Sequence, residues 1–167
     1  MINWDYRPSE VANLLNPAFC GVILRDFIRA YKEESGDGVP YELLFLLLPI
    51  VLHTNSRVNL PNSVRTHMHV WLQNVPEVRI GFSKRVKELV PFTKETISFL
   101  LQKGYLEIDE DGKVLSKNKR YRISLSRMNR DTNSYIQDYK NKSELVGKWF
   151  ARTGSSSTIY TMWGIRP

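Results

Sequence analysis

The chain has 167 residues, of which 42% are hydrophobic and 25% charged, with a formal net charge of +7 at pH 7. This composition excludes an intrinsically disordered chain, and the length suits one domain with a hydrophobic core. The single cysteine cannot form an internal disulfide, and the first ten residues lack the features of a signal peptide, so we expect a cytoplasmic protein. The longest apolar run, Leu43 to Leu52, is too short to span a membrane.

The first half of the chain is predicted to be helical. A helix over residues 9–34 is interrupted or restarts at Asn16-Pro17, because Asn suits an N-cap and Pro suits the first helical turn. A second helix, over residues 41–53, is apolar nearly all round, and we therefore expect it at the centre of the fold. A third helix follows, with Ser63 as its expected N-cap.

The central segment predicts a winged-helix-like arrangement. A short helix is expected to end at Pro91, and a second one, capped by Thr93, is expected to end at Gly104. Two runs of alternating residues, YLEID and KVLSK, flank Asp111-Gly112, a pair typical of a type I′ hairpin turn. Helix, turn, helix and then a two-stranded hairpin is the order of elements in a winged helix.

The last part of the chain is predicted to contain a helix over residues 129–152 and a strand from Thr158 to Trp163. The strand needs a partner, which is either the hairpin or another chain. We thus expect a predominantly helical α+β fold with a winged-helix-like centre, a β-hairpin wing and a C-terminal strand. It is predicted as a single domain over residues 1–167, with a helical part over 7–75, a winged-helix-like part over 78–125 and a C-terminal helix and strand over 129–167.

Cys20 is the residue that most invites a catalytic interpretation, and its position argues against one. On a helical projection it lies near the middle of an apolar arc that also contains Leu24 and Phe27. A catalytic thiolate needs partial exposure and a positively charged neighbour or a base, so we expect Cys20 to pack in the core. The charged residues of the same helix fall on the opposite side: Arg25, Arg29, Lys32 and Glu33.

Other signatures of catalysis or of metal binding are scarce. The VGKWF stretch lacks the glycine loop and the Ser or Thr of a phosphate-binding P-loop. His67 and His69 are two residues apart, which points them to different faces of a helix, and with His53 they find no Cys or carboxylate at a matching spacing. We therefore expect no catalytic residue, no cofactor and no metal. A hydrolase that uses Cys20 or a histidine-bound metal is kept as a third hypothesis.

The positive charge is concentrated in one region. Residues 117–152 contain ten Lys or Arg and three Asp or Glu, whereas the rest of the chain has fourteen of each. Such an excess predicts contact with phosphates or with an acidic partner, or else a solvated helix face. The candidate contacts are Lys117, Lys119, Arg120, Arg122, Arg127 and Arg130.

Both ends of the chain resemble one protein family. The stretches RPSEVANLLNPAFCGVILRDFIRAY and VGKWFARTGSSSTIYTMWGIRP resemble the middle component of the three-component ABC systems of bacteria, and the match covers essentially the whole chain. The resemblance implies a non-catalytic accessory protein. Its Lamassu-type members work in antiphage and antiplasmid defence beside an SMC-like ATPase and an effector, commonly a nuclease. The most specific parts of the match are Arg7-Pro8, Asn16-Pro17-Ala18-Phe19, Lys148-Trp149-Phe150, Gly164 and Arg166-Pro167.

The leading functional hypothesis is an accessory subunit that bridges an SMC-like ABC ATPase and an effector nuclease, with non-specific DNA contact and no membrane contact. It would restrain the effector until the ATPase engages foreign DNA. The alternative is a stand-alone winged-helix DNA-binding regulator. Large aromatic rings anchor interfaces, but they also fill cores, so Trp149 and Phe150 have both interpretations. The candidate interface anchors are Trp149, Phe150, Tyr160 and Trp163.

Overall fold

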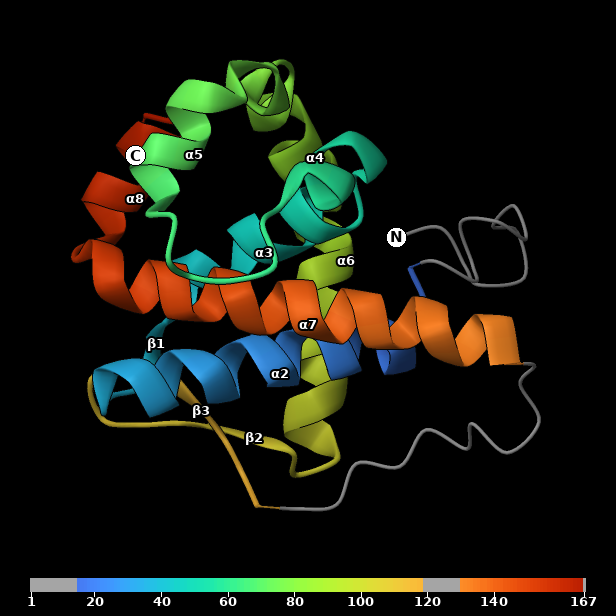
Figure 1. The fold of residues 1–167 in the computed structure, drawn as a ribbon. Coiled ribbons are helices and arrows are strands. Elements are labelled where there is room, and N and C mark those ends of the chain that lie inside the picture. The colour runs from blue at the N-terminus through green and yellow to red at the C-terminus, as the bar shows by residue number, and fades with distance from the viewer. Residues whose placement is uncertain (1–14, 119–129, 167) are drawn as a thin grey trace.

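The computed structural model describes residues 15–118 and 130–166, and for residues 130–133 the backbone alone. The described chain is mostly helical and has one small antiparallel sheet (Figure 1), which confirms the expected predominantly helical α+β fold. No helix in these two segments is long and apolar enough to cross a membrane. The helices are α2 (Pro17–Ser35), α3 (Leu44–Val51), α4 (Thr54–Asn59), α5 (Met68–Asn74), α6 (Phe82–Gln102), α7 (Arg130–Thr153) and α8 (Ser156–Met162). Two 3₁₀ turns, η2 (Tyr41–Leu43) and η3 (Pro76–Arg79), and the strands β1 (Val39–Pro40), β2 (Leu106–Ile108) and β3 (Lys113–Ser116) complete the set.

Helices α2 and α7 lie side by side (Figure 1). The start of α2 is as predicted: Pro17 is its first residue, and the Asn16 side chain accepts a hydrogen bond of 2.8 Å from the backbone N–H of Ala18. The two helices run in the same direction, because successive acidic and basic side chains of α2 pair with successive residues of α7. These pairs are Asp26 with Lys140, Arg29 with Glu144 and Glu34 with Arg152.

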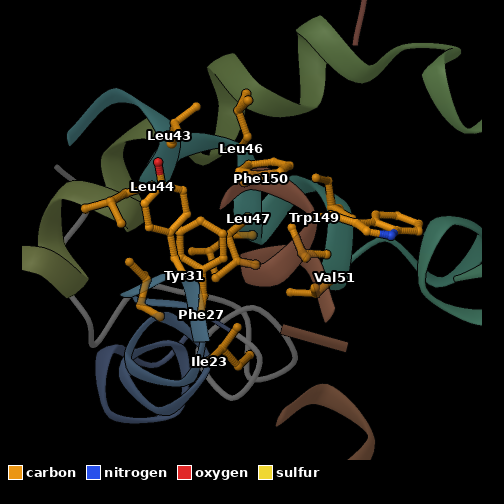
Figure 2. Packing of buried hydrophobic residues seen from close by; sticks show 14 of the residues in the cluster. Ile23, Phe27, Tyr31, Leu43, Leu44, Leu46, Leu47, Val51, Trp149 and Phe150 are labelled. Atoms are coloured by element: carbon orange, nitrogen blue, oxygen red, sulfur yellow. The ribbon is translucent and has the colours of Figure 1, made fainter. Parts of the chain in front are cut away.

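The core is built around α3, as its continuous apolar sequence predicts. Every residue of α3 except Phe45 is buried. Figure 2 shows Leu44, Leu46 and Leu47 of α3 close to Phe27 of α2 and Phe150 of α7. The Phe27 and Phe150 rings meet edge to face, with centroids 5.6 Å apart. Helices from both ends of the chain therefore share one hydrophobic core.

The expected break within residues 82–102 is wrong, because α6 is one continuous helix that contains Pro91. Proline removes one backbone hydrogen bond, but it does not end a helix that is stabilised by packing against neighbouring elements. Thr93, the predicted N-cap, instead donates its hydroxyl to the carbonyl of Leu89 at 3.0 Å. Both Thr93 and Thr96 are fully buried. The helix-turn-helix part of the winged-helix prediction is therefore not formed by these residues.

The predicted hairpin is confirmed, but its turn differs. Strands β2 and β3 pair antiparallel, and β1 adds to the other side of β3, giving the order β1-β3-β2. Of the residues in the hairpin loop, Gly112 alone has a positive φ, of 76°, so Asp111 does not adopt the type I′ conformation. The loop is longer: the Asp109 N–H donates to the Lys113 carbonyl at 2.9 Å and so closes a loop of residues 110–112.

The expected C-terminal strand is wrong, because residues 156–162 form helix α8. Ser155 caps it by accepting a hydrogen bond from the N–H of Thr158 at 3.3 Å. Ile159 and Trp163, four residues apart, are both buried, so the segment has a helical burial pattern in spite of its β-branched residues. The predicted cap of the third helix also differs, since α5 begins at Met68 and not after Ser63.

Candidate anion-binding groove

A groove with a volume of about 980 Å³ lies between α2 and the hairpin. Helix α2 lies between α7 on one side and β2 and β3 on the other (Figure 1), so its charged arc forms one wall of this groove. Among the described residues of the lining, four are positively charged and two are negatively charged. The lining residues are Arg25, Arg29, Lys32, Glu33, Glu107, Ser116, Lys117 and Asn118.

The α2 wall carries Arg25, Arg29 and Lys32, whose spacing places them on one face of the helix. Arg29 is surrounded by carboxylates: its Nη2 is 2.7 Å from Glu144 Oε1 and 3.2 Å from Asp26 Oδ1. Its charge is thus compensated within the chain. Lys32 is exposed and makes no ion pair with any residue in the described segments.

Asp26 lies behind this wall, where α2 packs against α7. Its side chain is 9% exposed, and burial raises the pKa of Asp26 although Lys140 and Arg29 favour the charged form. Lys140 Nζ lies 3.8 Å from Asp26 Oδ2. Asp26 therefore ties Arg29 and Lys140 together and fixes the position of the wall.

Arg25 is fixed against the other wall. Its guanidinium lies over the Tyr105 ring, 5.2 Å from the ring centroid, and its Nη2 donates to the Lys117 carbonyl at 3.2 Å. The Lys117 N–H in turn donates to the Tyr105 carbonyl at 2.9 Å. An arginine held over an aromatic ring is pre-organised for planar anionic groups. The Arg25 side chain therefore joins the two walls of the groove.

Lys117 stands at the end of β3. Its Nζ is 3.2 Å from Glu107 Oε2 on the neighbouring strand, and each of the two side chains is 48% exposed. Exposed pairs of this kind contribute about 0.2–1 kcal/mol. An anion entering the groove can therefore replace Glu107 at small cost.

Comparison with known protein families shows to which family the chain belongs. The family described as ABC-three component (ABC-3C) system Middle Component 3 matches residues 4–167. The chain belongs to this family. No curated protein and no solved structure matches it. Membership in a three-component system implies that this Middle Component 3 protein has partner components.

The basic residues predicted from the sequence are only partly described in this Middle Component 3 chain. Lys117 lies in the groove. Arg130 is the first residue of α7, and its side chain lies outside the described residues. The remaining four candidates are also outside them: Lys119, Arg120, Arg122 and Arg127. The α2 wall was not predicted as a site from the sequence, although the charged arc of α2 indicates it.

Three of the four candidate interface anchors are core residues in this conformation. Trp149, Phe150 and Trp163 are each no more than 2% exposed. Trp163 stacks on Phe82 with ring centroids 4.4 Å apart. Tyr160 is half-buried, and its hydroxyl donates to the Glu42 carbonyl at 2.7 Å. These rings fill the chain's own interior because α7 and α8 fold back over α5 and α6. The expected terminal strand did not predict this packing.

The Cys20 thiol is buried in the contact between α2 and α6. Its exposed fraction is 0%, and burial raises the pKa of Cys20 to about 12. A thiol with this pKa is protonated at neutral pH and is not a nucleophile. His67 and His69 stack with ring centroids 5.7 Å apart, and within the described residues no group of three His, Cys, Asp or Glu could hold a metal ion.

The loop between α4 and α5 is held by buried donors. Lys142 Nζ donates to the Leu60 carbonyl at 2.8 Å and to Asn62 Oδ1 at 3.1 Å. Trp149 Nε1 donates to the Thr66 carbonyl at 2.9 Å. Burial lowers the pKa of Lys142. Helix α7 thus uses one face to hold this loop and another to hold α2.

Proposed function

We propose that this chain is a non-catalytic accessory subunit that bridges the SMC-like ABC ATPase and the effector nuclease of a three-component antiphage or antiplasmid defence complex. The match of residues 4–167 to the Middle Component 3 family carries the proposal. In this role the chain restrains the effector until the ATPase engages foreign DNA.

The described side chains support a binding role over a catalytic one. The one cysteine is fully buried, with a pKa of about 12. His53 is engaged locally: its Nδ1 accepts a hydrogen bond from the Ser56 N–H at 3.2 Å, where it caps α4. By contrast, six charged residues of the described chain line an open groove, which is a binding feature.

The basic region is proposed to contribute contacts with DNA phosphates or with acidic side chains of a partner. In the described part of the chain, Lys117 places the start of this region in the groove. The region continues with Lys119, Arg120, Arg122, Arg127 and Arg130, and residues 117–130 contain no Asp or Glu. A run of one sign attracts phosphates or carboxylates through long-range electrostatics.

The alternative function, a stand-alone winged-helix regulator, loses one of its structural supports. It required two helices separated by a short turn before the hairpin. The continuous α6 provides no such turn within residues 82–102. We therefore do not favour it.

Co-purification from the native host tests the bridging role. The chain is tagged at its own locus, and mass spectrometry identifies the proteins that remain bound. We expect to recover an SMC-like ATPase and an effector together. In a second strain the ATPase carries the tag and the gene for this chain is deleted, and we then expect the effector to be lost.

Recovery of the effector with the ATPase in the deletion strain would overturn the bridging role. Recovery of this chain without any protein partner would do the same. Replacement of Lys119, Arg120 and Arg122 with Glu tests the basic region, and replacement of Lys84, Lys87 and Lys94 on α6 with Glu is the matched control. If the first variant and the control assemble and bind DNA equally well, the basic region has no part in either contact.

A further inference from the structure

We propose that the groove between α2 and β3 binds the phosphates of a nucleic-acid backbone, with Arg25, Lys32 and Lys117 as cationic contacts. Ser116 and Asn118 provide neutral hydrogen-bond donors at the same wall as Lys117. Arg, Lys, Ser and Asn side chains are the groups that proteins commonly direct at phosphates. The proposal deepens the proposed DNA contact of the basic region and assigns it to residues of α2 that the family match does not identify.

The arrangement of the cations follows a polymer better than a single small anion. Arg25 and Lys32 are seven residues apart on α2, which is about 10 Å along a helix axis. Successive nucleotides of one DNA strand advance by about 3.4 Å, so this distance corresponds to about three steps. Lys117 faces the α2 residues from the opposite wall. The groove thus offers contacts along its length and not at one point.

The lining favours a nucleic acid over a protein segment. Protein interfaces have an apolar, often aromatic, core that supplies most of their affinity. All eight of the described residues that line the groove are polar or charged, so this part of the chain gives a peptide no apolar side chain to anchor it. Protein–DNA interfaces are more polar and more positive than protein–protein interfaces. The composition of this groove matches the second kind.

The two glutamates of the groove make the contact weak and adjustable. Glu107 competes with phosphate for Lys117 at 3.2 Å, and Glu33 lies 3.7 Å from Arg29. Contacts to phosphates carry no information about base sequence, so binding through these residues should depend on the backbone alone. We therefore expect equal affinity for unrelated DNA sequences of the same length.

Fluorescence anisotropy of a short labelled duplex with the full chain tests the proposal over a series of salt concentrations. The variants are Lys32→Gln and Lys117→Gln, which each remove one charge, and Glu107→Gln, which releases Lys117. Lys84→Gln is the matched control, because Lys84 lies on α6 with an 81% exposed side chain and does not line the groove. Circular dichroism and thermal unfolding verify that all variants fold.

We expect Lys32→Gln and Lys117→Gln each to reduce the slope of log affinity against log salt by about 0.9, which is about eightfold in affinity at 0.1 M salt. Glu107→Gln should raise the affinity, and Lys84→Gln should leave it unchanged. The absence of duplex binding by the wild-type chain, or an unchanged slope in both folded lysine variants, overturns the proposal. Binding of a polyglutamate peptide that depends on Lys32, with duplex binding that does not, also overturns it.

The outcome is separable from that of the bridging experiment. The co-purification readout requires only protein partners, whereas the anisotropy readout uses the isolated chain and DNA. Loss of the groove contact with intact co-purification would remove the DNA site and leave the bridging role. The reverse result would leave a phosphate-binding protein that does not bridge.

Discussion

Gly147 lies at a close approach between α2 and α7, and its replacement by alanine tests how this pair is packed. A Cβ atom added there would lie 2.5 Å from the Phe27 carbonyl oxygen, 3.1 Å from the Tyr31 nitrogen and 3.2 Å from the Ala30 Cβ. Ordinary contact begins at 3.4 Å. The closest of these atoms belong to the backbone, so a change of side-chain rotamer cannot relieve the clash. The helices would have to separate by roughly 1 Å at this point.

Two opposing effects set the size of the change. Alanine in a helix interior is about 1 kcal/mol more favourable than glycine. Overpacking a well-packed core costs about 1–3 kcal/mol, and a clash with backbone belongs in the upper part of that range. We therefore expect Gly147→Ala to lower the free energy of unfolding by about 1–2 kcal/mol. Denaturant titration followed by circular dichroism measures it as a lower midpoint at an unchanged slope.

Asn141→Ala is the matched control, because Asn141 is an exposed residue of the same helix. It gains helix propensity without a new contact, so its free energy of unfolding should stay within about 0.5 kcal/mol of the wild-type value. A Gly147→Ala variant as stable as the wild type or more stable would refute the close approach of α2 and α7. The shared core of Figure 2 would then need a different arrangement.

Three further changes probe other parts of the core. Because burial raises the pKa of Cys20 to about 12 from 9.0, the unfolded thiol ionises first, and wild-type stability should fall by up to about 1.4 kcal/mol per pH unit between these values. Cys20→Ala should remove this part of the pH dependence, and identical profiles would contradict the burial. Lys142→Met leaves the carbonyl oxygens of residues 60–61 without their donor, so it should cost about 1–3 kcal/mol and speed amide hydrogen exchange in that loop; unchanged exchange would argue against the contact. Gly38→Ala places a Cβ 2.9 Å from the Lys113 Cβ, which should separate β1 from β3 and speed exchange in β3, and full protection there would count against this pairing.

Short-range signals predicted the elements that local chemistry defines. Asn16-Pro17 marks the start of α2 because a polar cap and a fixed φ act within one turn, and both are present. Gly36 ends the same helix with a φ of 78° for the same kind of local reason. The alternation on either side of Asp111-Gly112 gave the hairpin, although the turn itself is one residue longer than the pair suggests.

Long-range packing decided the elements that the sequence did not predict. Pro91 ends isolated helices, but α6 continues through it, packed against α2 and α3. The β-branched residues before Trp163 favour a strand, yet Ile159 and Trp163 are both buried on one side of α8. In both cases a local backbone preference, worth about 1 kcal/mol to a few kcal/mol, competes with the free energy gained when several large side chains are buried. The burial is the larger quantity, and it depends on partners that are distant in sequence.

The groove also depends on long-range packing, which explains why the sequence indicated its charged residues and not their arrangement. The polar arc of α2 was readable from helical periodicity, and Lys117 was readable from the charge count. Their proximity was not readable, because Arg25 and Lys117 are 92 residues apart, and Tyr105 and the pairing of β2 with β3 bring them together.

The two faces of α2 therefore have different roles: one packs in the core and the other lines the groove. Its apolar face, with Phe27 and Cys20, packs in the core, so substitutions there should reduce stability. The opposite face presents Lys32 to the groove, where a substitution removes a charge and no buried contact. Arg29 is the exception, since it holds Glu144 on α7 and a change there would disturb both. A loss of DNA binding in Lys32→Gln without a loss of stability is consequently the result that distinguishes a binding surface from a solvated helix face.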